Sequence, residues 1–191
     1  MSYELIICEK PSAAMKIAYA LGGASIRRSK IRGLPVFWLD LDRKRAAVVP
    51  ALGHLYGVEQ NSTGWSFPIF DLKWNPLKDR RKRAWIEAIA EVAKGAKSYV
   101  CACDFDVEGS LIGYMILRYA CGGADSKAKR MRFSTLTKEE LRAAYRNVLS
   151  SLDYERVYAG KVRHEVDWIF GVNASRALMD ALGSVGGVFE V

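Results

Sequence analysis

Residues 99–109 read Tyr-Val-Cys-Ala-Cys-Asp-Phe-Asp-Val-Glu-Gly, and this stretch is the most informative part of the sequence. Its first five residues form a short unbroken apolar run, which is typical of a strand buried on both faces of a parallel sheet. Asp104, Asp106 and Glu108 then follow at alternate positions. The stretch therefore predicts a buried strand with an acidic cluster directly after its end.

Three carboxylates so close together repel one another, and each raises the pKa of the others. No fold requires this arrangement, so we infer a counter-cation. Oxygen ligands without Cys or His favour Mg²⁺ or Mn²⁺, and we predict Mg²⁺ held by Asp104, Asp106 and Glu108. A calcium EF-hand loop would need Glu at its twelfth position, where Met115 stands. An acidic helix start that uses the helix dipole explains one or two of the carboxylates but not three.

A second apolar run, Leu5–Cys8, ends at Glu9 and Lys10. Pro11 suits the first position of a helix, so this is again a strand, a polar turn and a helix. Glu9 is interpreted either as an ordinary helix-start residue or as a fourth carboxylate of the acidic cluster. In the second case the acidic cluster raises the pKa of Glu9, and the protonated carboxyl can donate its proton to a leaving sugar oxygen. Lys10 can neutralise a phosphate oxygen.

Strands alternate with helices along the chain, which predicts an α/β fold with a mainly parallel sheet flanked by helices, followed by a small helical segment. Functional groups in such sheets collect at the carboxyl ends of the strands, so Glu9 and Asp104 are expected to meet. Residues 61–76 are expected to be irregular, and 183–191 to form no clear element. The other predicted elements are strands at 36–39, 46–49 and 131–133, and helices at 11–21, after 78–83, and at 111–119, 138–149, 153–170 and 173–182.

The chain is basic, with 29 Lys and Arg against 21 Asp and Glu. A net charge of +8 suits a polyanionic partner such as nucleic acid, although solubility alone also explains it. The basic runs at 78–83 and 27–32 are solvated surface or DNA contacts. Only two histidines and no C-x₂-C pair argue against a zinc finger. No apolar run reaches the roughly 18 residues of a membrane span, so we expect a cytoplasmic protein with reduced thiols.

Five stretches together resemble the Toprim domain of type IA DNA topoisomerases, especially the archaeal form. They are residues 5–12 (Leu-Ile-Ile-Cys-Glu-Lys-Pro-Ser), 53–55 (Gly-His-Leu), 104–109, 132–138 (Arg-Phe-Ser-Thr-Leu-Thr-Lys) and 159–177. The resemblance implies a Rossmann-like Toprim domain over 1–150. It also implies that 151–191 begins a helical domain lining a single-stranded DNA groove.

The resemblance also implies roles for individual residues. Glu9 would assist proton transfer at the leaving 3′-oxygen, and Lys10 would contact the scissile phosphate. Mg²⁺, held by the acidic cluster, would position the DNA ends. The candidate contacts to the backbone of single-stranded DNA are Arg132, Arg163, Asn173 and Arg176.

None of the nine tyrosines lies in the surroundings typical of that family's nucleophile. We therefore interpret the chain as an N-terminal part of a topoisomerase, inactive alone, with the remaining domains and DNA as its partners near the nucleoid. The alternatives are a stand-alone Toprim nuclease that cuts with Mg²⁺-activated water, and a non-catalytic nucleic-acid binding module. His54 is interpreted as structural, fixing the turn at Gly53 by a side-chain hydrogen bond.

Overall fold

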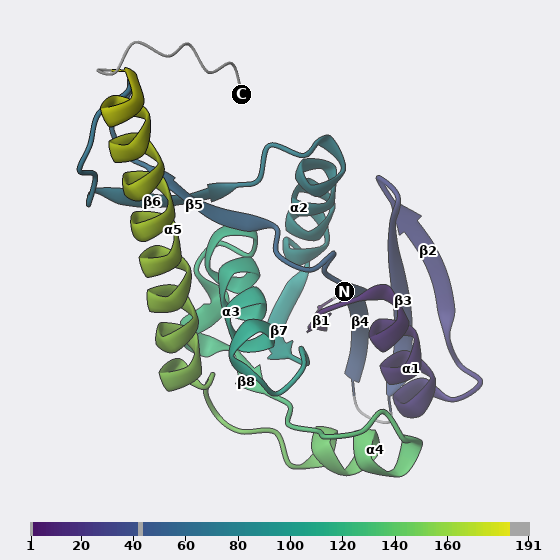
Figure 1. Ribbon diagram of the computed structural model, residues 1–191. Coiled ribbons are helices and arrows are strands. Elements are labelled where there is room, and N and C mark those ends of the chain that lie inside the picture. The colour runs from purple at the N-terminus through teal and green to yellow at the C-terminus, as the bar shows by residue number, and fades with distance from the viewer. Residues whose placement is uncertain (1, 42–43, 184–191) are drawn as a thin grey trace.

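The computed structural model describes residues 2–41 and 44–183, and a mixed six-stranded sheet forms its centre (Figure 1). The strand order is β2-β3-β4-β1-β7-β8. Neighbouring strands from β4 to β8 run parallel, whereas β2 and β3 add an antiparallel edge. The strands are β1 (Tyr3–Cys8), β2 (Arg27–Ile31), β3 (Leu34–Leu41), β4 (Lys44–Pro50), β7 (Ala96–Cys101) and β8 (Lys129–Arg130). The predicted mainly parallel sheet is confirmed.

Strand β1 lies at the middle of the sheet, and its side chains alternate between two hydrophobic cores. Leu5 and Ile7 pack into the core on one face, and Ile6 and Cys8 into the core on the other. All four are fully buried, which is why this strand is an unbroken apolar run. Each such residue contributes about 1.5–3 kcal/mol by leaving water.

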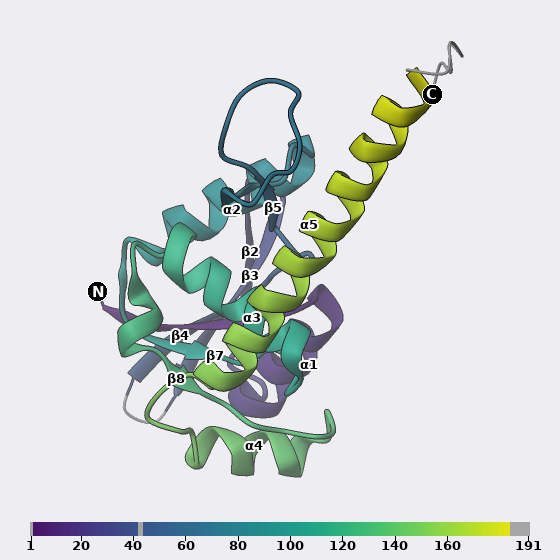
Figure 2. The ribbon, with the colours of Figure 1, turned by 60° about the vertical axis from the view of Figure 1, so that its left-hand side comes forward.

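Helices cover both faces of the sheet (Figures 1 and 2). One face carries α2 (Arg80–Ala93), α3 (Val107–Met115) and a π-helical turn at Ile116–Ala120. The other carries α1 (Pro11–Gly22) and α4 (Lys138–Arg146). A short 3-10 turn, Ala124–Lys127, leads into β8. The α/β layering places the starts of α1 and α3 at the same edge of the sheet.

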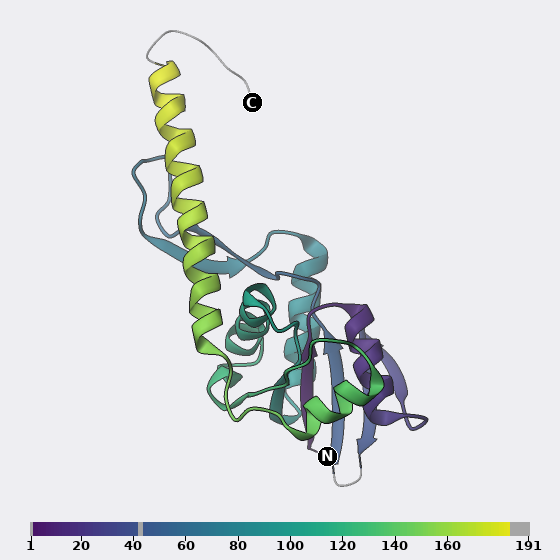
Figure 3. The same ribbon diagram turned by 60° about the horizontal axis from the view of Figure 1, so that its bottom comes forward.

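The last helix, α5 (Tyr154–Gly183), is a single element of 30 residues. Its first half packs on α3, where Gly160 faces Leu111 and Val107. Its second half extends away from the sheet beside a small hairpin, β5 (Tyr56–Gln60) and β6 (Leu72–Pro76) (Figure 3). No helix within the described residues is long and apolar enough to cross a membrane.

Several predicted elements differ from the structure. The predicted helices at 153–170 and 173–182 are one helix, because Gly171 and Asn173 interrupt the apolar spacing without breaking the backbone hydrogen bonds. The irregular stretch at 61–76 contains β6. Strand β2 was missed because its exposed basic residues carry no apolar pattern. The third strand lies at 129–130 rather than 131–133, and α4 ends at Arg146 rather than 149. Residues 184–191 lie outside the described part.

Two glycine substitutions test the packing of α3 and α5. A Cβ on Gly113 would stand 2.2 Å from the Cys101 sulfur, whereas one on Gly171 meets nothing within 4 Å. We predict that Gly113→Ala lowers the free energy of unfolding by about 1–3 kcal/mol, because the strand behind it cannot move aside. Gly171→Ala should raise it by about 0.5–1 kcal/mol through better helix propensity. Urea denaturation of both variants measures the two changes in unfolding free energy. Equal changes would contradict the close packing of Gly113 against Cys101.

Candidate metal and nucleic-acid site

The carboxyl ends of β1 and β7 bring two sequence-distant polar turns together. The strands are parallel neighbours, and the amide of Ala102, the residue after β7, donates to the Ile7 carbonyl of β1 at 2.7 Å. Lys10 Nζ then lies 2.9 Å from an Asp104 carboxylate oxygen and 3.8 Å from a Glu9 oxygen. Glu9 and Asp104 thus meet through Lys10, as their positions at two strand ends suggested.

Negative charge is crowded at this edge. Burial, together with the neighbouring charge of Asp104, raises the pKa of the Glu9 carboxyl, and Lys10 only partly offsets the rise. Asp106 also raises this pKa, so its charge reaches Glu9 as well. The hydrogen bond to Asp104 raises the pKa of the Lys10 ammonium. The carboxyl group best placed to hold a proton here is therefore Glu9.

The turn that carries the acidic residues is shaped by a helix cap. Asp106 has an extended backbone and accepts a hydrogen bond from the Gly109 amide at 2.6 Å, which satisfies a free donor of the first turn of α3. A Cβ on Gly109 would stand 2.3 Å from the Asp104 carbonyl oxygen. Glycine is required here because the helix start presses against the strand end.

A buried arginine supports the same turn from behind. The Arg130 side chain is 1% exposed and donates to the carbonyl oxygens of Cys101, Cys103 and Asp104 at 3.2, 2.7 and 2.7 Å. These three carbonyls belong to the chain leaving β7, so one guanidinium holds the backbone on which the acidic cluster stands. Arg130 was missed in the sequence because one Arg beside an apolar run resembles a surface residue.

Phe105, between the two aspartates, gathers cationic side chains. The guanidinium groups of Arg156, Arg132 and Arg130 lie 4.2, 5.0 and 5.4 Å from its ring centroid. Arg132, a predicted DNA contact, is exposed and is held near the acidic turn by this ring. Three arginines, one of them buried, therefore lie around the ring that separates the two aspartates in the sequence.

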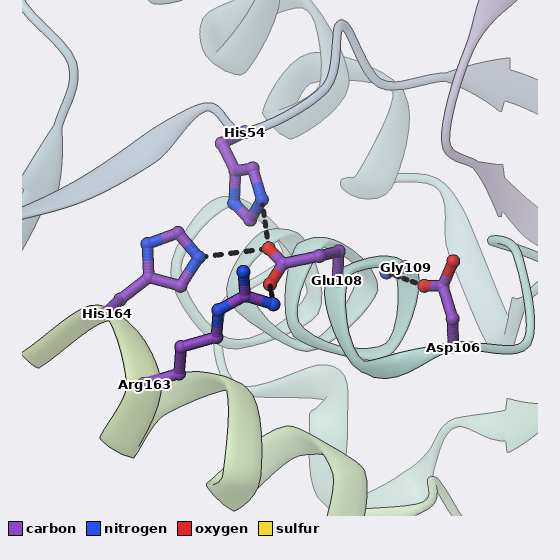
Figure 4. A network of polar contacts seen from close by, with 6 residues as sticks. All are labelled: His54, Asp106, Glu108, Gly109, Arg163 and His164. Carbon is purple, nitrogen blue, oxygen red and sulfur yellow. Dashed lines mark hydrogen bonds and ion pairs between the residues drawn. The ribbon is translucent and has the colours of Figure 1, made fainter. Parts of the chain in front are cut away.

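Glu108 faces away from this edge, toward α5 (Figure 4). One carboxylate oxygen accepts hydrogen bonds from Nε2 of His54 at 2.8 Å and of His164 at 2.9 Å, and Arg163 lies 3.5 Å from the other oxygen. Burial opposes the charge on Glu108, but the hydrogen bonds from the histidines outweigh it and lower the pKa of the carboxyl. Burial lowers the pKa of His54 despite the bond to Glu108.

His54 therefore differs from its predicted role. Its side chain reaches across to Glu108 rather than closing its own turn, and Gly53, with φ of 62°, makes that turn. Together His54, Glu108 and His164 offer three ligand atoms, all within 4.8 Å of one another. The described residues thus contain a possible metal-binding cluster of acidic and histidine side chains, which the sequence pattern of carboxylates alone did not indicate.

The other two predicted DNA contacts lie on the second half of α5. The Asn173 side chain accepts from the Ile69 amide at 2.8 Å and donates to the Ile69 carbonyl at 2.9 Å. Arg176 donates to the Ser66 carbonyl at 2.7 Å. Both residues hold the loop between β5 and β6, whereas Arg132 and Arg163 lie at the acidic turn and at Glu108.

The structure thus combines a mainly parallel sheet with acidic residues at its carboxyl edge, and this combination agrees with a known domain family. The Toprim domain family matches residues 4–136, and the chain belongs to this family.

Its relatives include a DNA topoisomerase 1 of Methanocaldococcus jannaschii, 46% identical over 95% of this chain and 24% of that protein. A DNA topoisomerase 1 of Pyrococcus horikoshii is 40% identical over 98% of this chain and 28% of its own length. A DNA topoisomerase 3 of Bacillus licheniformis is 29% identical over 93% of this chain and 24% of its own. The chain thus spans about a quarter of the length of these relatives.

Arg130 should contribute much more to stability than Arg132, which lies near the same Phe105 ring. We predict that Arg130→Met costs about 2 kcal/mol or more of unfolding free energy, because three buried carbonyls lose a charged donor. The matched variant Arg132→Met, which removes an exposed arginine from the same ring, should change stability by about 0.5 kcal/mol or less. Thermal or urea unfolding gives both values, and an Arg130→Met variant as stable as Arg132→Met would refute the role.

Proposed function

We propose that this chain is the Mg²⁺- and DNA-binding Toprim part of a type IA DNA topoisomerase, an enzyme that cleaves, passes and rejoins single strands. The observation that carries the proposal is the meeting of Glu9 and Lys10 with Asp104 at one sheet edge. The alignment with topoisomerases over 93% or more of the chain supports it.

The donor set at this edge fits Mg²⁺. Asp104 and Asp106 offer carboxylate oxygens, which this ion prefers, and the charge that raises the pKa of the nearby Glu9 carboxyl favours a cation. Glu108 belongs to the same predicted set, but its carboxylate lies with the two histidines, so its part in holding Mg²⁺ stays a prediction. A bound Mg²⁺ would supply positive charge that orients DNA phosphates.

The protein's own side chains would handle the phosphate and the proton. The raised pKa of Glu9 favours a protonated carboxyl that can donate to the leaving 3′-oxygen of the DNA. The Lys10 ammonium, with a side chain 47% exposed, can move from Asp104 to a phosphate oxygen. In the whole enzyme the attacking tyrosine would come from the part of the relatives' length beyond this chain.

Single-stranded DNA would cross the acidic edge and follow α5. Arg132 and Arg163 are exposed beside the acidic turn and Glu108, and suit phosphate contacts there. Asn173 and Arg176 would contact DNA further along the helix, after exchanging their bonds to the 61–71 loop. We assign 1–150 to the Toprim domain and 151–191 to the start of a helical DNA-groove domain.

Mg²⁺ dependence of DNA binding tests the proposal. We predict that Mg²⁺ tightens binding of a single-stranded oligonucleotide several-fold in the parent chain, and that Asp104→Asn and Asp106→Asn remove this gain. Asp180→Asn, an exposed carboxylate near the end of α5, removes the same charge and should keep it. Fluorescence anisotropy with and without Mg²⁺ measures the effect, and an equal gain in all variants would place the ion elsewhere.

The same samples show whether the chain is instead a stand-alone nuclease that cuts DNA by itself. The chain should bind the oligonucleotide in a salt-sensitive way without cutting it, because the nucleophile is expected elsewhere. Mg²⁺-dependent cleavage that is lost in Asp104→Asn would support a nuclease using metal-activated water and overturn the topoisomerase assignment. Salt-sensitive binding without any Mg²⁺ effect would leave a non-catalytic binding module.

A further inference from the structure

A groove of about 600 Å³ lies along α1, on the face of the sheet opposite α5. Helices α1 and α4 lie side by side on that face (Figure 3). The groove, called the α1 groove below, is formed by the exposed side of α1 and the start of α4, with Met15, Lys16, Tyr19, Leu136 and Lys138 among its lining residues. Among the described residues that line it, no side chain is acidic. Nothing in the proposed function uses this surface.

The α1 groove begins about one helical turn from the acidic edge. Helix α1 starts at Pro11, directly after Lys10, and Met15 lies one turn further on the exposed side of the helix. At about 1.5 Å per residue, Tyr19 stands about 12 Å from Pro11 along the helix axis. A DNA strand that crosses the acidic edge from the side of α5 would therefore reach this groove within a few nucleotides.

We propose that the α1 groove binds single-stranded DNA and carries the strand onward from the acidic edge along α1. The inference rests on the proposed function, because it extends the path of the same strand from the α5 face of the sheet to the α1 face. Single strands are commonly bound by a positively charged groove with an aromatic side chain, since the cations attract phosphates and the ring stacks on a base. The α1 groove offers both features.

Tyr19 supplies the aromatic ring, and Arg28 of β2 holds it in place. Tyr19 is 44% exposed. Arg28 donates a hydrogen bond to the Tyr19 hydroxyl, and its guanidinium carbon lies 5.3 Å from the Tyr19 ring centroid and 5.9 Å from that of Phe37. Because the ring is already fixed, a base that stacks on it avoids the entropy cost of ordering a free side chain.

Three cations stand near this ring. Lys16 lines the groove from α1 and Lys138 from the first turn of α4, and both are exposed. Arg28 adds its charge beside Tyr19. The other arginines of the basic run at 27–32 already pair with carboxylates on β3 and α2. Arg28 is therefore the arginine of this run that serves the α1 groove.

Two features oppose this attraction and show where phosphates should lie. Glu139, next to Lys138 in the chain, is exposed and weakens the positive field there, although the positive end of the α4 dipole offsets it. The carboxyl end of α1, near Gly23, carries the negative end of the α1 dipole. We therefore expect phosphates at Lys16 and Lys138, and a base rather than a phosphate toward the end of α1.

Binding of a fluorescent single-stranded oligonucleotide tests the lysines. We predict that Lys16→Gln/Lys138→Gln binds it several-fold more weakly, and that the slope of log affinity against log salt concentration shrinks by about 1.4, because two phosphate contacts are lost. Lys94→Gln/Lys97→Gln removes the same charge from exposed lysines around the start of β7, at the other edge of the sheet, and should change neither quantity. Affinity that falls equally in both double variants, or in neither, would overturn the proposal.

Two substitutions of Tyr19 test the stacking. Tyr19→Ala should weaken single-strand binding by about fivefold or more, whereas Tyr19→Phe keeps the ring and should bind like the parent. A duplex of the same length, whose bases are already stacked, should bind both variants equally. Crosslinking of the parent by a 4-thiothymidine oligonucleotide needs no substitution, and labelled peptides should include residues 11–24 or 134–138. Labels confined to α5 would overturn the proposal.

The Mg²⁺ gain in the same binding assay separates this inference from the proposed function. Both double lysine variants should keep the full gain, because the acidic edge is intact in each. An unchanged affinity in Lys16→Gln/Lys138→Gln with a normal Mg²⁺ gain would remove only the path along α1, whereas a parent without any gain would remove the proposed function. Labelled polyglutamate of matched charge that binds the groove as tightly as the oligonucleotide would assign it to an acidic protein and overturn the DNA proposal.

Discussion

Carboxylate repulsion at the carboxyl edge of β1 and β7 is the constraint on which the rest of this structure depends. Parallel pairing brings Glu9 and Asp104 to one edge, and Asp106 follows Asp104 there, whereas the Glu108 carboxylate turns toward α5. Repulsion between these carboxylates lowers the stability of the folded state, and apolar packing does not remove that repulsion. The surrounding structure is therefore organised around supplying positive charge and hydrogen-bond donors to this edge.

The counter-charges come from three directions. Lys10 reaches Asp104 from the start of α1. Arg130 lies behind the turn and donates to its backbone carbonyls rather than to its carboxylates. His164 and Arg163 bind Glu108 from α5, and His54 binds it from the turn after β4. Each of the three acidic residues after β7 thus has a partner within the protein, whereas burial and the neighbouring Asp104 charge raise the pKa of Glu9.

The core of this arrangement could be predicted from the sequence, since buried parallel strands are unbroken apolar runs and the acidic residues follow them directly. The failures share a physical cause, because each depends on contacts between distant segments. Strand β2 is exposed and basic, and forms by pairing with β3. Helix α5 continues past Gly171, and its Asn173 and Arg176 bind the distant 61–71 loop. His54 meets Glu108 only through the packing of α3.

Helix α5 connects the two groups of functional residues. Its first half supplies His164 and Arg163 to Glu108, and its second half holds the loop between β5 and β6. Because the helix is continuous over 30 residues, anything that shifts it against α3 acts on both ends at once. Such a shift would affect Glu108 directly, because its partners His164 and Arg163 lie on α5 while its backbone belongs to α3. Whether the Glu108 side chain points to the histidines or to the acidic edge therefore depends on how α5 packs on α3, not on the local acidic motif.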